Sequence, residues 1–195
     1  MSRRLLAISA IVVLFVFRLF LFQAKAQQQS GGFLPVAPEK AIQTYLGLRN
    51  GALHSTSGKV KPPKSLRPSD PWAILMDWPT GDRTATTAAF ADGTVSIYIS
   101  NGGGFLGGGQ KYASVRKAGE NMLALAREFQ PQMHATKDYP LPPQGQVNFY
   151  LVTNSGVFTI SAPESECKTR THPLTRLYFA GQEIITQYRL ALSWQ

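Results

Sequence analysis

A two-residue turn at Asp92-Gly93, followed at once by an alternating segment, constrains the fold more than any other feature of the sequence. Asp-Gly is a preferred hairpin turn, and apolar and polar positions alternate from Thr94 to Ser100. A period of two is typical of a strand with one buried face. Trp72 to Trp78 and Arg83 to Ala91 have the composition of two further strands. The sequence therefore predicts a three-stranded antiparallel meander.

The segment 113–129 has the helical period. Its apolar positions recur at steps of three and four, and Pro131 ends the pattern; they are Val115, Ala118, Met122, Leu125 and Phe129. Gly119 interrupts this helix at a cost of about 1 kcal/mol relative to alanine. We expect a close approach of the helix to the sheet to explain that glycine.

A second hairpin and a final helix complete the pattern. Gln146 to Val152 and Val157 to Ser161 are predicted strands joined by a turn at 154–156, and a helix is expected to begin near Pro173. The order β-β-β-α-β-β-α with hairpin turns predicts an α+β domain with an antiparallel sheet of about five strands and packed helices.

Two resemblances accompany this pattern. The order of elements resembles profilin-like and roadblock-type modules. The stretch from Gly93 to Gly104 and the triplet His172-Pro173-Leu174 resemble a group of bacterial proteins of unknown function, over residues 72–192. Neither resemblance implies an activity, because a fold does not supply a function.

The N-terminal residues 1–26 are predicted to be a signal peptide or a membrane anchor. Arg3 and Arg4 precede the uncharged run Leu5 to Phe17, and Ala24-Lys25-Ala26 places small residues where a signal peptidase cleaves. Because apolar residues continue after Arg18, two alternatives to a cleaved signal peptide remain: an uncleaved inner-membrane anchor, and a misassigned start codon before a cytoplasmic domain. A signal peptide or an anchor would place the domain in the periplasm or outside the cell.

Residues 27–71 are interpreted as a tether that holds a short accessory helix at 38–50 and a proline-rich linker. The main α+β domain is then expected to occupy residues 72–195.

The net charge of +9 does not indicate nucleic-acid binding. Four of the 20 basic residues lie in residues 1–26, which leaves 16 bases against 11 acids. The one dense basic run, from Lys59 to Arg67, is spaced by prolines and lacks the aromatic residues that stack on bases.

The glycine-rich segment between the third strand and the helix at 113–129 is the candidate ligand or partner loop. It holds six glycines in the nine residues 101–109, and its site residues are Asn101, Gly103, Gly104, Phe105, Leu106, Gly108 and Gln110. Glycines let backbone N–H groups approach an anion at a helix N-terminus. A purely structural turn should need fewer glycines, so alanine at Gly103 and Gly108 is expected to leave the melting temperature unchanged or higher.

Catalytic and metal signals are weaker. Cys167, the only cysteine, and His172 form a possible thiolate–imidazole pair. Asp77 is interpreted as a turn-capping residue. The three histidines are scattered without zinc spacing, so no metal site or cofactor is predicted.

Three functions remain open from the sequence. The first is a non-enzymatic binding or interaction module outside the cytoplasm, whose partner is a protein or a small molecule. The second is a small-molecule or anion-binding domain that uses residues 101–110. The third is a hydrolase that uses Cys167 and His172.

Overall fold

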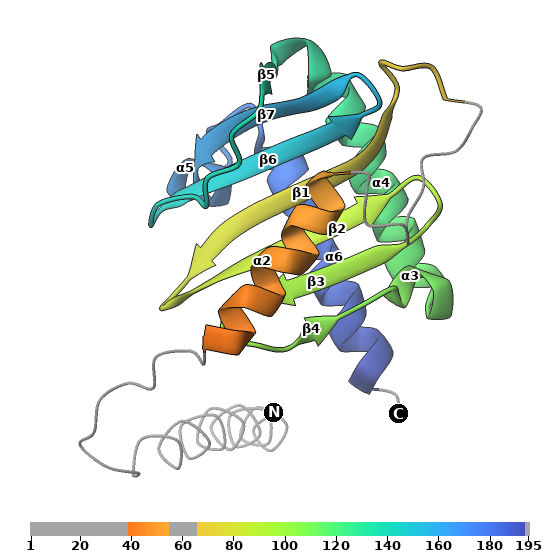
Figure 1. The fold of residues 1–195 in the computed structure, drawn as a ribbon, viewed down its shortest axis with the longest axis vertical. Helices are drawn as coiled ribbons and strands as arrows, with labels where there is room; N and C mark the ends of the chain where they lie inside the picture. The colour runs from red at the N-terminus through yellow and green to blue at the C-terminus, as the bar shows by residue number, and fades with distance from the viewer. Residues whose placement is uncertain (1–38, 55–65, 194–195) are drawn as a thin grey trace, which may run out of the picture. The chain divides into compact units, whose positions relative to one another are not determined.

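The computed structural model describes residues 39–54 and 66–193. The predicted leader, most of the tether and most of the proline-rich linker lie outside these residues. The described part is an α+β domain with an antiparallel sheet, as the sequence predicts (Figure 1). None of its helices is both long enough and apolar enough to cross a membrane.

The sheet has seven strands in the order β4-β3-β2-β1-β6-β7-β5. The strands span Pro71–Thr80 (β1), Arg83–Phe90 (β2), Val95–Ile99 (β3), Gly104–Phe105 (β4), His134–Thr136 (β5), Gln146–Thr153 (β6) and Gly156–Pro163 (β7). The expected meander and second hairpin are β1-β2-β3 and β6-β7, and β1 pairs with β6 to join them. The two strands that the sequence did not predict, β4 and β5, are two and three residues long, too short for a periodic pattern.

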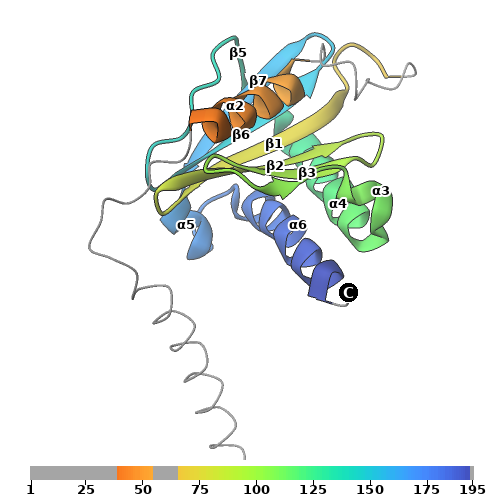
Figure 2. The same ribbon diagram turned by 60° about the horizontal axis from the view of Figure 1, so that its bottom comes forward.

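Two long helices cover one face of the sheet, and one shorter helix lies on the other (Figure 2). The helices span Glu39–Leu53 (α2), Gly108–Lys111 (α3), Ala113–Phe129 (α4), Glu164–Lys168 (α5) and Thr175–Ser193 (α6), with a 3₁₀ turn at Gln130–Gln132 (η1). The predicted limits of α4 are confirmed. The final helix begins two residues after Pro173.

The face under α4 and α6 holds the larger core. Met122 of α4 and Ile184 of α6 are fully buried against Met76 of β1. A Cβ at Gly119 would lie 2.4 Å from Val95 and 3.3 Å from Ala89. The expected close approach of the helix to the sheet therefore explains this glycine.

The opposite face is covered by α2. Tyr45, Ala52 and Leu53 of this helix are buried in a second core with Leu75 and Tyr150 of the sheet. The helix at 38–50 was predicted to be part of the tether. The side chains that it buries against the sheet make it part of the packed domain instead. Because β1 is covered on both sides, nine of its ten residues are buried.

Candidate functional site: the groove beside α2

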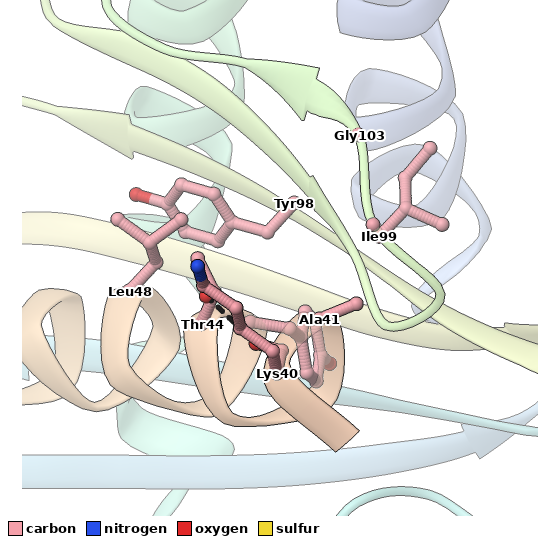
Figure 3. Close-up of a pocket in the computed structure, with 9 residues that line it drawn as sticks. Lys40, Ala41, Thr44, Leu48, Tyr98, Ile99 and Gly103 are labelled. Carbon is pink, nitrogen blue, oxygen red and sulfur yellow. Dashed lines mark hydrogen bonds between the residues drawn. The ribbon is translucent and has the colours of Figure 1, made fainter. Parts of the chain in front are cut away.

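An apolar groove runs between α2 and the β3 side of the sheet, and we call it the α2 groove. It consists of two cavities of about 320 Å³ each, which share Leu48 and Tyr98. Lys40, Ala41, Thr44, Tyr45, Ile99, Gly102 and Gly103 line the first cavity, and Gly47, Gly51, Ala52, Trp72, Phe90, Thr94, Ser96, Leu106 and Gly107 line the second. Figure 3 shows the first cavity, with α2 on one side and Tyr98 and Ile99 on the other.

Small residues on α2 open the groove. Ala41, Gly47, Gly51 and Ala52 line it and carry no side chain larger than a methyl group. A Cβ at Gly47 would meet no atom within 4 Å. Glycine inside a helix costs about 1 kcal/mol relative to alanine, so α2 keeps this open space at the expense of its own stability.

Two exposed leucines flank the second cavity. Leu48 of α2 is 36% exposed, and Leu106 of the glycine-rich segment is 65% exposed. Pockets for small molecules are mostly apolar and concave, with volumes of about 300–1,000 Å³. The α2 groove has this character.

The polar side chains of the groove walls are already hydrogen-bonded. The Thr44 hydroxyl donates to the Lys40 carbonyl at 2.8 Å, and Ser96 Oγ accepts from the Gly107 N–H at 3.1 Å. Tyr45 is bonded to Thr86 at 2.9 Å. Burial and nearby Asp77 raise the pKa of Tyr45, which keeps its hydroxyl protonated. These walls therefore offer few free polar groups to a ligand.

Two polar groups differ from the rest. Lys40 is the only charged side chain among the described residues that line the groove, and it is exposed. The indole Nε1 of Trp72 is buried and meets no acceptor in the described part of the chain.

A buried ion pair anchors α2 beside the groove. Arg49 Nε donates to Asp77 Oδ2 at 2.8 Å, and Arg49 Nη1 donates to the Tyr139 carbonyl at 2.9 Å. Thr86 donates to the other carboxylate oxygen of Asp77 at 2.5 Å. Asp77 is fully buried in the middle of β1, so its interpretation as a turn-capping residue is wrong. No local pattern indicates that Arg49, 28 residues earlier in the chain, is its partner.

The structure brings only part of the predicted loop to the groove. Gly103 and Leu106 line it, together with Gly102 and Gly107 of the same segment. Asn101 lies in the turn before β4 and does not line the groove. Gly104 pairs with Tyr98 in the sheet.

The remaining loop residues serve the fold. Phe105 pairs with Ile97 and stacks on Tyr188 of α6, with ring centroids 5.0 Å apart. Gly108 is buried and its N–H donates to the Tyr188 hydroxyl at 2.9 Å. Gln110 Nε2 approaches the Asp92 carbonyl at 3.4 Å.

Every glycine of this segment has a structural reason. The backbone has positive φ at Gly102, Gly103, Gly104 and Gly107. A Cβ at Gly108 would overlap the Tyr188 side chain, and one at Gly109 would overlap the Gly93 carbonyl. The expectation that a structural turn here needs fewer glycines is therefore wrong, because backbone conformation requires four of them and close packing requires the other two.

The backbone amides of the segment do not form an anion site of the expected kind. The Gly107 and Gly108 N–H groups donate to Ser96 and Tyr188, and the Gly102 N–H donates to the Ile99 carbonyl at 3.0 Å. The helix that follows, α3, is only four residues long. The geometry favours an apolar ligand over an anion held by the loop backbone.

Cys167 and His172 do not form a catalytic pair. Cys167 is completely buried, and burial together with Glu166 and Glu164 raises the pKa of its thiol. His172 Nδ1 accepts a hydrogen bond from the Leu174 N–H at 3.1 Å. A nucleophilic thiol needs the opposite environment, with a lowered pKa and access to solvent.

No protein-family model, no curated protein and no solved structure matches the chain. Within residues 39–54 and 66–193, no three His, Cys, Asp or Glu side chains gather to hold a metal ion. The α2 groove is therefore interpreted from its own chemistry.

Proposed function

We propose that this domain is a non-enzymatic binding module that takes a small, largely apolar ligand in the α2 groove. The observation that carries the proposal is the pair of open, largely apolar cavities between α2 and the sheet, lined by leucine, tyrosine and small residues and flanked by the exposed Leu48 and Leu106. The hydrogen-bonded polar groups on its walls favour a ligand with few polar atoms, because a buried polar group without a partner costs free energy.

The location of the module is part of the proposal. The basic and apolar character of residues 1–26 favours a protein that is exported or anchored in the inner membrane, with the domain outside the cytoplasm. An Ala26→Asp variant should then accumulate as an unprocessed, larger band if the segment is cleaved. A full-length wild-type chain in the soluble cytoplasmic fraction would contradict the proposed location.

A groove-filling variant tests the binding. Gly47→Leu places a side chain in the second cavity, where a Cβ meets no neighbour. The variant should lose at least tenfold in affinity for the uncharged dye N-phenyl-1-naphthylamine, measured by its fluorescence increase. The melting temperature should stay equal or rise, because leucine is the better helix former.

A matched control lies on the same helix. Gln43 is exposed and does not line the groove, so Gln43→Leu should bind the dye as wild type does. Equal dye affinity in Gly47→Leu and wild type would show that the groove is not the site.

A further inference from the structure

The chemistry of the α2 groove identifies a class of ligand, and this step rests on the proposed function. We infer that the groove binds a single-chain amphiphile with a carboxylate head group, a long-chain fatty acid, whose head pairs with Lys40 and whose alkyl chain passes Leu48 and Tyr98 toward Leu106.

The shape of the groove fits one extended chain. Its lining runs along α2 from Lys40 to Ala52, a distance of about 18 Å at 1.5 Å per residue. With bonds of about 1.5 Å, each of which advances a zigzag chain by about 1.3 Å, an alkyl chain of roughly fifteen carbons has this length. Leu48 and Tyr98 line both cavities, and one extended ligand would pass between these two side chains to occupy both.

The walls exclude a peptide in favour of an alkyl chain. A peptide segment in the groove would bury its own N–H and C=O groups, which require partners. The β3 backbone at Ile97 and Tyr98 is already paired with β4, and β2 pairs with the other edge of β3. The hydroxyls of Thr44 and Tyr45 are also engaged. An alkyl chain has no polar groups to satisfy.

The charge of Lys40 predicts the sign of the charge on the head group. No other charged side chain among the described residues lines the groove, and Lys40 is exposed where a head group would meet water. Figure 3 shows the Lys40 side chain extending from the first turns of α2 along the cavity. A carboxylate is therefore favoured over an uncharged or cationic head group of equal chain length.

The test compares three twelve-carbon probes on the full chain in detergent-free buffer: dodecanoate and dodecyltrimethylammonium, each below its micelle concentration, and 1-dodecanol below its solubility limit. Displacement of N-phenyl-1-naphthylamine gives their affinities. Dodecanoate should bind up to about fivefold more tightly than dodecanol, the range of an exposed ion pair. Shortening the acid should weaken binding about fourfold per methylene.

Two lysine variants complete the test. Lys40→Met should bring dodecanoate to the affinity of dodecanol and leave dodecanol unchanged. Lys117→Met, at an exposed position of α4 away from the groove, should keep the preference. A preference that survives in Lys40→Met would overturn the inference, since the head group would then lie elsewhere, for example at Trp72.

Other outcomes separate the two proposals. Equal binding of all three probes, with loss in Gly47→Leu, would overturn the carboxylate inference and support the apolar site. Failure of the dye and of every probe to bind would overturn both. Binding to phospholipid vesicles without binding of monomeric dodecanoate would also overturn the inference.

Discussion

Breaking the buried ion pair between α2 and the sheet should destabilise the domain strongly. Arg49 is 2% exposed and Asp77 is fully buried, and their closest N···O distance is 2.6 Å. Arg49→Met removes the guanidinium and leaves a carboxyl group with Thr86 as its remaining partner. Removing one member of a buried pair costs about 3–5 kcal/mol, a large share of a typical stability of about 5–15 kcal/mol.

The expected loss lies toward the lower end of that range. Burial raises the pKa of Asp77, while Arg49 and Thr86 oppose the rise. Without Arg49, the buried carboxyl is expected to take up a proton, which limits the penalty of an unpaired charge. The double variant Arg49→Met/Asp77→Leu removes both charges and should recover most of the stability.

Urea unfolding measures these free energies. Arg176→Met is the control, because Arg176 pairs with Glu128 at 3.2 Å with both side chains more than half exposed. The control should change the free energy of unfolding by about 0.5 kcal/mol or less. If Arg49→Met costs no more than the control, the ion pair does not hold α2 on the sheet.

Three further predictions test the packing. Met122→Asp should unfold most of the protein at 25 °C, because it buries a carboxylate. Glu120→Ala, at an exposed position, should change the free energy of unfolding by about 0.5 kcal/mol or less. Equal stability of the two variants in urea titrations would contradict the orientation of α4. Gly108→Ala, which overlaps Tyr188, should cost about 1–3 kcal/mol. Gly103→Ala, at φ 89° in open space, should lower the free energy of unfolding by about 1–2 kcal/mol. Unchanged melting temperatures in Gly103→Ala and Gly108→Ala would refute the structural role of these glycines. Iodoacetamide should label Cys167 at neutral pH only after unfolding, as mass spectrometry would show; rapid labelling of the native chain would restore the thiol as a candidate nucleophile.

Local patterns were sufficient to predict the main elements of the fold. The period of two after Asp92-Gly93 and the period of three and four in 113–129 depend on neighbours in the sequence, and both predictions are confirmed. The sheet order required more, because the pairing of β1 with β6 joins segments about 75 residues apart. No turn signal encodes such a contact.

The sequence predicted one wall of the candidate site and missed the other. The glycine-rich segment was recognised, but its partner surface on α2 was not, because the helix was placed in the tether. One signal was available: Gly47 and Gly51 weaken a helix that also buries Tyr45 and Leu53. Small residues in a helix that packs on a sheet indicate either close packing or a cavity, and only the structure distinguishes the two.

Glycine amide resonances test the central claim most directly, because five glycines line the α2 groove: Gly47, Gly51, Gly102, Gly103 and Gly107. Gly81 and Gly145 lie in turns and Gly156 begins β7; none of the three lines the groove, so they serve as internal controls. The full chain labelled with ¹⁵N-glycine is titrated with N-phenyl-1-naphthylamine. The account predicts saturable shifts at the groove glycines and unchanged control resonances. Shifts confined to the controls, or no shifts at a saturating dye concentration, would contradict it.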